Sequence, residues 1–224
     1  MLIPSIDLMG GRIVQLVRGE KLKLAFDDFD YWIGRFAAYP LVQLIDLDAA
    51  MRQGNNAELI AMIAKRLPCQ VGGGIRTAEQ ARALLDAGAR AVIFGSVLFD
   101  EAGVDTKVAE EISTAIGRER FVASVDTKDG RVAVRGWKEQ VELTPEQAIA
   151  ILEPYCGAFL YTHVDREGTM QGFPLERARV LRELTTRKLI VAGGIREHAE
   201  IDALHEMGVD AVAGMAVYSG LLAT

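Results

Sequence analysis

A glycine-rich motif occurs twice in this chain, about half a chain length apart. One copy is Val71–Arg76 and the other is Ala192–Arg196, so that Gly74 and Gly194 occupy equivalent positions 120 residues apart. Each copy lies between an apolar run and a helical pattern. Glycines at such a turn allow backbone N–H groups to approach an anion at the start of a helix. The repeat therefore predicts a protein that binds a ligand with a phosphate at each end.

Eight short apolar runs alternate with helical patterns along the chain. Such runs are typical of parallel strands with helices on one face and core on the other. No linker interrupts the alternation, which predicts an α/β protein with a single (β/α)8 (TIM) barrel over residues 1–224. Periodicity alone also allows a doubly wound open sheet. The predicted strands are Leu2–Ile6, Leu41–Ile45, Cys69–Val71, Ala91–Phe94, Phe121–Val125, Ala158–Tyr161, Leu189–Ala192 and Ala211–Ala213.

Start and stop signals mark the helices between these strands. Thr77 and Thr144 each open a capping box with a glutamine three residues later, and Asn56 can cap the helix that Pro68 stops. Further helices are expected at Phe26–Tyr39, Val104–Ile116 and Leu175–Leu184, around Ile201–Met207, and after Ala216.

The internal repeat extends beyond the glycines. Thr77–Val92 aligns with Glu197–Val212, Ile6–Ile13 resembles Val125–Val132, and Met51–Gly54 is a weaker echo of Thr169–Gly172. The chain thus contains two similar (β/α)4 halves, about 1–117 and 118–224, related by a pseudo-twofold axis. This relation favours the barrel over the open sheet.

Composition narrows the range of partners. Half of the residues are hydrophobic, so a large core can be buried, and the net charge of −6 is spread without acidic or basic runs. These features argue against nucleic acid and against an anionic membrane surface. Two isolated cysteines, no secretory signal after Met1 and no apolar stretch of membrane-spanning length predict a cytoplasmic protein. We expect a monomer that binds a small molecule.

Two aspartates, Asp7 and Asp126, end the first and fifth predicted strands at equivalent positions of the repeat. In a (β/α)8 barrel the active site lies at the carboxyl ends of the strands, where strands one and five face each other. Two carboxyls that flank one ligand can perform acid–base chemistry if their surroundings keep one protonated and the other ionised. A role in a turn would explain either aspartate alone, but the repeat relation favours catalysis by the pair.

Residues that follow the other strands form two candidate phosphate sites. Glycines at one β–α turn are weak evidence, but two sets in the same repeat relation favour two phosphates. Ser96 can donate a hydroxyl, whereas its counterpart Met215 offers only a backbone N–H. One set comprises Gly73, Gly74, Gly95 and Ser96, and the other comprises Gly193, Gly194, Gly214 and Met215.

Three side chains near these turns allow more than one interpretation. Arg76 can contact a phosphate or lie in solvent at the start of its helix. Trp137, in the loop after the fifth strand, can close on a planar base as a lid or pack on the rim of the barrel. His163 is near the expected pocket, but no residue at ligand spacing accompanies it, so no metal site is predicted.

Together these residues resemble a known enzyme family, the phosphoribosylformimino-5-aminoimidazole carboxamide ribotide (ProFAR) isomerases of histidine biosynthesis. The resemblance covers essentially the whole chain. It implies a (β/α)8 barrel without a cofactor that rearranges a bisphosphate aminoaldose, ProFAR, into the aminoketose PRFAR. The matching segments are Ile3–Leu8, Asp46–Asp48, Gln70–Arg76, Val125–Asp126, Gly136–Trp137 and Arg166–Thr169.

The resemblance also implies roles for individual residues. Asp126 is expected to be the general acid that protonates the ribose ring oxygen, and Asp7 the general base that removes the C2′ proton. Thr162 is expected to support Asp126 or the opened sugar by hydrogen bonding. The two glycine sets become the phosphate sites, and the remaining substrate-binding residues are Arg76, Trp137, Gly168 and Thr169.

Three positions depart from the family pattern. Glu167 stands where aspartate is usual, His163 replaces an acidic residue, and Ala192 replaces a serine. Three other readings remain open. The cyclase subunit of imidazole glycerol phosphate synthase fits the start of the chain less well, and a bifunctional isomerase would also act on phosphoribosyl anthranilate. A non-catalytic sugar-phosphate binding barrel is the third, and the aspartate pair argues against it.

Overall fold

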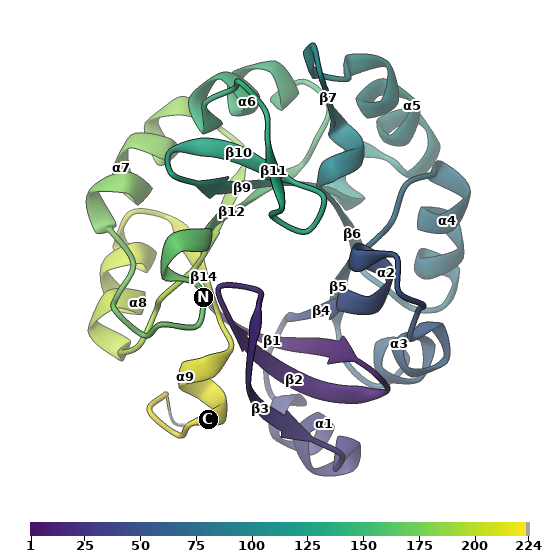
Figure 1. Ribbon diagram of the computed structural model, residues 1–224, viewed down its shortest axis with the longest axis vertical. Coiled ribbons are helices and arrows are strands. Elements are labelled where there is room, and N and C mark those ends of the chain that lie inside the picture. The colour runs from purple at the N-terminus through teal and green to yellow at the C-terminus, as the bar shows by residue number, and fades with distance from the viewer. Residues whose placement is uncertain (223–224) are drawn as a thin grey trace.

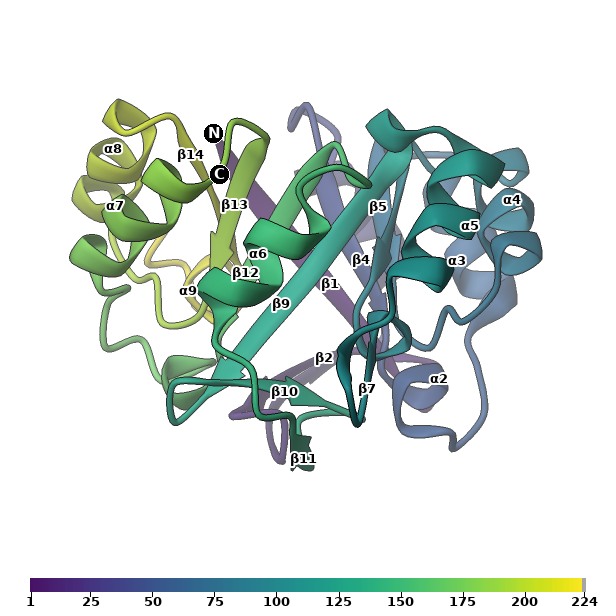
Figure 2. The same cartoon turned by 90° about the horizontal axis from the view of Figure 1, so that it is seen from above.

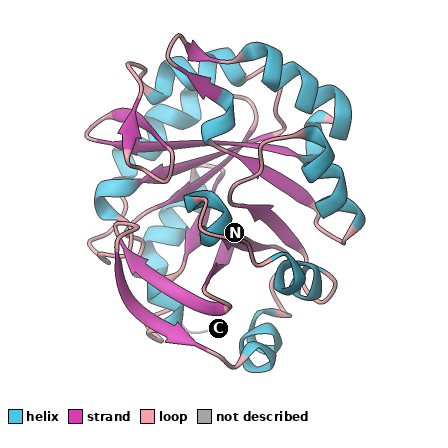
Figure 3. Cartoon of the chain, turned by 45° about the vertical axis from the view of Figure 1, so that its right-hand side comes forward, coloured by secondary structure: helices cyan, strands magenta, loops and turns pink. Residues whose placement is uncertain are grey.

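Eight parallel strands form a closed barrel in the computed structural model, which describes residues 1–222 (Figure 1). The strands follow one another around the barrel in chain order, pairing β6 with β9 on one side and β14 with β1 on the other. Most of the helices lie outside the strands, as Figures 1 and 3 show. The predicted (β/α)8 barrel is confirmed, and the closing pairs exclude the open sheet.

Most predicted elements match the observed ones to within a few residues. The barrel strands are β1 (Leu2–Met9), β4 (Val42–Asp46), β5 (Cys69–Gly72), β6 (Ala91–Phe94), β9 (Phe121–Lys128), β12 (Ala158–His163), β13 (Lys188–Ala192) and β14 (Val209–Ala213). The helices are α1 (Phe29–Phe36), α2 (Leu47–Met51), α3 (Ala57–Ala64), α4 (Ala78–Asp86), α5 (Thr106–Ile116), α6 (Pro145–Leu152), α7 (Leu175–Leu184), α8 (His198–Glu206) and α9 (Met215–Tyr218). None of these described helices is long and apolar enough to cross a membrane.

Six short strands outside the barrel were not predicted. They are β2 (Arg12–Val17), β3 (Lys21–Phe26), β7 (Phe99–Asp100), β8 (Gly103–Val104), β10 (Arg131–Val134) and β11 (Glu139–Gln140). β1 runs on beyond Asp7 and turns back as β2, and β9 runs on beyond Asp126 and turns back as β10. Figure 2 shows β2, β10 and β11 at the same end of the barrel. Both aspartates therefore lie within their strands, two residues before the strand ends, which corrects the prediction.

The helix starts are set by local capping, and two of them differ from the prediction. Both capping boxes, at Thr77 and Thr144, are present. α1 begins at Phe29 because the Asp28 side chain accepts from Tyr31 N, and α5 begins after Asp105, which accepts from two backbone N–H groups. Asn56 precedes α3, but its side chain does not cap that helix.

Two separate hydrophobic cores hold the barrel together. One lies between the strands and the surrounding helices, and includes Phe36, Phe94, Phe121 and Phe159, all fully buried. The other lies inside the barrel, where side chains from the strands pack against one another. Its buried members are Ile3, Ile93, Val122, Ala158, Leu160, Ile190, Ala192 and Val212. Successive side chains of each strand point alternately to the two cores. The polar residues at the carboxyl ends of the strands lie beyond these cores, at the open end of the barrel.

A buried hydrogen-bond network fixes the β1–β2 turn to the end of β4. The Asn56 amide donates to Asp46 Oδ1 (2.8 Å) and Asp48 Oδ2 (2.9 Å), and Asn56 Oδ1 accepts from Gly11 N (3.1 Å). Asp48 Oδ2 also accepts from Gly10 N (2.7 Å). The Asp46–Asp48 segment is therefore structural, and Asn56 is its central member.

We expect Asn56→Ala to lower the free energy of unfolding by about 2–4 kcal/mol, because it removes the three hydrogen bonds of the side-chain amide with Asp46, Asp48 and Gly11. Urea denaturation measures the change. Asn55→Ala is the matched control: Asn55 is exposed, accepts one hydrogen bond from Ala57 N, and is expected to cost no more than about 1 kcal/mol. Equal effects of the two substitutions would contradict the assignment.

Candidate active site

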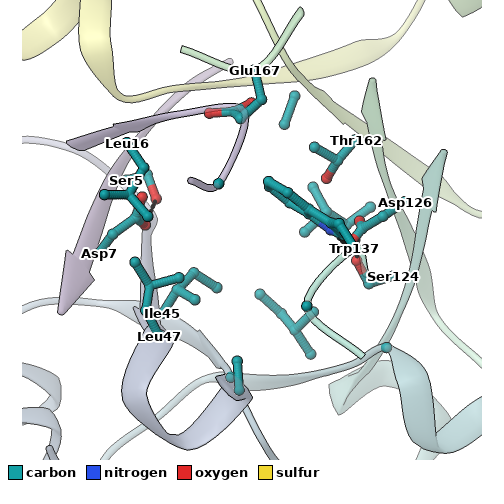
Figure 4. Close-up of a pocket in the computed structure, with 18 of the residues that line it drawn as sticks. Ser5, Asp7, Leu16, Ile45, Leu47, Ser124, Asp126, Trp137, Thr162 and Glu167 are labelled. Carbon is teal, nitrogen blue, oxygen red and sulfur yellow. Dashed lines mark hydrogen bonds between the residues drawn. The ribbon is translucent and has the colours of Figure 1, made fainter. Parts of the chain in front are cut away.

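A cavity of about 590 Å³ opens at the end of the barrel where the hairpins lie. Asp7 and Ser5 line one side, and Asp126, Ser124 and Thr162 line the opposite side, as Figure 4 shows. The two predicted glycine sets also line this cavity. The structure therefore brings the aspartate pair and both candidate phosphate sites into one space.

Asp7 accepts a hydrogen bond from a residue of its own strand. Ser5, two residues earlier, points to the same face and donates a hydrogen bond from Oγ to Asp7 Oδ1 (2.7 Å). Burial raises the pKa of Asp7 to about 6, and the bond from Ser5 offsets only part of that effect. The carboxyl is therefore ionised in most molecules at neutral pH, yet basic enough to accept a proton.

Asp126 is held in the same way and has further donors. Ser124 donates to Oδ1 (2.8 Å), and the Trp137 indole N–H donates to Oδ2 (2.7 Å). Burial raises the pKa of Asp126 above its usual range, while the hydrogen bonds of Trp137, Ser124 and Thr162 hold it down. Thr162 lies opposite Asp126 in the β9–β12 register, which places it beside the carboxyl.

The glycine turns approach the neighbouring strand more closely than any other residue type allows. Gly73 and Gly193 have φ of 100° and 108°, in the left-handed region. A methyl group added to Gly73 would lie 2.2 Å from Asp46 O, and one added to Gly193 would lie 2.5 Å from His163 O. These contacts leave the backbone of both turns facing the cavity.

Three predicted positions differ from the expectation in detail. Thr169 does not line the cavity; its hydroxyl donates instead to Arg166 O (2.8 Å) and closes a local turn. Arg76 lines the cavity, but its guanidinium donates to the carbonyls of Gly74 (2.9 Å) and Ala49 (3.3 Å). His163 lines a separate small cavity outside the barrel.

Glu167 is a cavity residue that the sequence reasoning did not assign to the site. Figure 4 shows its carboxyl pointing into the space between Asp7 and Asp126. Burial, with the charges of the two aspartates, raises the pKa of Glu167 to about 8. In the sequence, Glu167 stood out only as a glutamate where the family usually has an aspartate. That difference does not predict where the longer side chain points.

The two hairpins meet over the cavity. A methyl group at Gly19, in the β2–β3 turn, would lie 2.6 Å from the Trp137 ring, so that the ring packs directly on this turn. Arg18 N donates to Glu167 O (2.9 Å), which joins the same turn to the loop after β12. Trp137 therefore lies inside the cavity, between Asp126 and the opposite hairpin.

Trp137→Phe is expected to raise the pKa of Asp126 further, because the substitution removes a hydrogen bond to the ionised carboxyl. Carbon-13 NMR of the aspartate carboxyls across a pH series measures the shift. Trp32→Phe is the control, since Trp32 is the other tryptophan and packs from α1 into the hydrophobic core. An unchanged Asp126 titration in Trp137→Phe would show that the indole contact has no electrostatic effect.

The chain is similar to known proteins over almost its whole length. Residues 1–223 match the family described as histidine biosynthesis protein. A relative from Methanocaldococcus jannaschii is 35% identical over 99% of this chain and 95% of its own length. Relatives from Methanothermobacter thermautotrophicus and Methanosphaera stadtmanae are 34% and 32% identical over the same shares. All three are named as the isomerase that the sequence motifs resemble. The chain belongs to the histidine biosynthesis protein family.

Proposed function

We propose that this chain catalyses the reaction for which its relatives are named, the isomerisation of ProFAR to PRFAR in histidine biosynthesis. Family membership over the whole chain supports the overall reaction. The observation that carries the assignment to particular residues is the pair of repeat-related aspartates, Asp7 and Asp126, on opposite sides of one cavity between two glycine turns.

The first step is opening of the ribose ring, with Asp126 as general acid. Asp126 gives its proton to the ring oxygen as the bond from that oxygen to C1′ breaks. The nitrogen on C1′ supplies its lone pair, and a protonated Schiff base forms. The raised pKa of Asp126 favours the protonated carboxyl that this step requires. Thr162 and Trp137 hold the carboxylate that remains.

The second step is removal of the C2′ proton, with Asp7 as general base. The electron pair of the C2′–H bond forms a double bond to C1′ and neutralises the Schiff base, which gives an enolamine. Loss of the proton of the C2′ hydroxyl and protonation of C1′ then give the aminoketose. A carboxylate with a pKa of about 6 is well matched to accept a proton at neutral pH.

The glycine turns hold the two ends of the substrate. Gly74, Gly95, Gly194 and Gly214 all line the cavity, and we assign the backbone N–H groups of the first two to one phosphate and those of the last two to the other. A bisphosphate that reaches both turns has its reacting ribose fixed near the carboxyl pair, and such positioning supplies a large part of the rate enhancement. We also propose that the enzyme is cytoplasmic, as its composition predicts, and that it is a monomer.

Asp7→Asn and Asp126→Asn are each expected to lower kcat by roughly 100-fold or more, since each removes a proton-transfer group. Substrate binding should survive, because neither amide alters the glycine turns. The assay uses ProFAR, with phosphoribosyl anthranilate as a second substrate. Turnover of ProFAR near the wild-type rate by either variant would refute the acid–base assignment, and turnover of both substrates by the wild type would reveal a bifunctional isomerase.

The pH dependence of kcat/KM is expected to be bell-shaped. Activity rises with pH through about 6 as Asp7 ionises and becomes a base. It falls at higher pH as the general acid Asp126 loses its proton. Glu167, which ionises at about 8, steepens this fall because it adds a negative charge to a cavity that binds a bisphosphate. Glu167→Gln should therefore keep the acidic limb and make the alkaline limb shallower. An alkaline limb of unchanged steepness in this variant would show that Glu167 does not contribute to it.

A further inference from the structure

The two phosphate turns have the same backbone but different side chains around them. Arg52 and Met170 occupy equivalent positions of the repeat, and both adopt the left-handed conformation, with φ of 60° and 54°. Both line the cavity. Few residues other than glycine adopt this conformation readily, so we infer that the fold requires it at both positions. The side chain at each position can then differ according to its effect on the ligand.

Each of these residues stands beside its own glycine turn. The segment before Arg52 packs on Gly74, where an added methyl group would lie 2.4 Å from Ala49 O. In the second half, Gly172 N donates to Gly194 O (2.8 Å), which fixes the segment after Met170 to that turn. We call the glycine positions that follow β5 and β6 (Gly73, Gly74 and Gly95) the β5–β6 turn, and those that follow β13 and β14 (Gly193, Gly194 and Gly214) the β13–β14 turn. The β5–β6 turn thus has an arginine beside it where the β13–β14 turn has a thioether.

A second pair of equivalent positions, Gln80 and Glu200, also makes the β5–β6 side less negative than the β13–β14 side. Gln80 Oε1 accepts from Arg76 N (2.8 Å), and its counterpart Glu200 accepts from Arg196 N (2.9 Å). Glu200 and Glu197 also pair with the Arg196 guanidinium, at 3.8 Å and 3.2 Å. In the first half the neutral Gln80 leaves the Arg76 charge without a carboxylate partner among residues 1–222.

The remaining groups near the turns follow this asymmetry. Ser96 lines the cavity on the β5–β6 side, where Arg135 N donates to its Oγ (2.7 Å). On the β13–β14 side Met215 stands in place of Ser96. Arg166 lies close to Gly194, but its guanidinium donates to Gly172 O (2.9 Å) and does not line the cavity.

We propose that the β5–β6 turn is the primary phosphate anchor and that Arg52 is the residue that makes it so, whereas the β13–β14 turn binds phosphate weakly and only as the second end of a tethered ligand. This inference rests on the proposed function, which supplies the two phosphates. A compound with one phosphate group occupies the β5–β6 turn first, because there an arginine charge adds to backbone donors that both turns share.

The test is a titration of the full chain with inorganic phosphate at constant ionic strength, followed by nitrogen-15 NMR. The amide signals of Gly74 and Gly95 report one turn, and those of Gly194 and Gly214 report the other. We expect the β5–β6 turn to saturate at a phosphate concentration roughly tenfold lower, as for one added charged hydrogen bond. Equal saturation, or earlier saturation of the β13–β14 turn, would overturn the proposal.

Two reciprocal variants separate the charge from the fold. Arg52→Met should remove most of the difference between the turns, Arg52→Lys should keep part of it, and Met170→Arg should strengthen phosphate binding at the β13–β14 turn alone. Since Arg52 and Met170 share one backbone conformation, both exchanges should leave the spectrum otherwise unchanged. An unaltered affinity of the β5–β6 turn in Arg52→Met would refute the role of this arginine.

Kinetics on ProFAR distinguish this inference from the proposed function. Arg52→Met is expected to raise KM roughly tenfold with kcat nearly unchanged, which is the pattern of lost uniform binding. A wild-type chain without turnover would refute the proposed function, while the phosphate titration would still decide which turn is the anchor. A fall in kcat at constant KM would show that Arg52 acts on the reaction step and would overturn its role as an anchor.

Discussion

The site depends on one backbone contact that the molecule makes twice. Gly73 lies against the carbonyl of Asp46 and Gly193 against that of His163, at distances that exclude any Cβ atom. This approach carries each β–α turn across the end of the preceding barrel strand and places both turns in the lining of the cavity. Because the two halves make the same contact, the cavity has two glycine turns, which are the candidate phosphate sites, and the strands that bear Asp7 and Asp126 open into the same space.

The parts of this arrangement that sequence patterns predict are those set locally or by the repeat. Apolar runs located the eight barrel strands, Thr77 and Thr144 located two helix starts, and the repeat identified the aspartate pair. The hairpin strands were missed because β3 has three exposed residues followed by three half-buried ones, which gives no alternating pattern, and it owes its place to pairing with β2. Glu167 was missed for a similar reason. Its direction is set by contacts far apart in sequence, the bond from Arg18 N and the packing of Gly168 on Leu16 O.

The two halves of the barrel share one backbone arrangement but differ in the polarity of the side chains at equivalent positions. In the first half Asp46 and Asn56 tie the β1–β2 turn to the end of β4 with buried hydrogen bonds. In the second half His163 holds the position of Asp46 in the strand register, and its Nδ1 has no hydrogen-bond partner among the described residues. A barrel with strict twofold symmetry would bind its substrate equally in two directions. Differences at equivalent positions allow one repeated scaffold to distinguish the two ends of a single ligand.

Charge in the cavity links binding to chemistry. Three carboxyls, those of Asp7, Asp126 and Glu167, share one cavity, and burial raises the pKa of each. A bound bisphosphate adds negative charge to the same space. One unit charge about 8 Å away, at an effective dielectric constant of about 20, changes the energy of a carboxylate by roughly 2 kcal/mol, more than one pKa unit. In the proposed mechanism, arrival of the substrate favours protonation of Asp126, the carboxyl proposed to act as the acid. The Ser124 and Trp137 bonds to Asp126 oppose that effect because they stabilise its ionised form, which eases the proposed transfer of its proton to the ring oxygen.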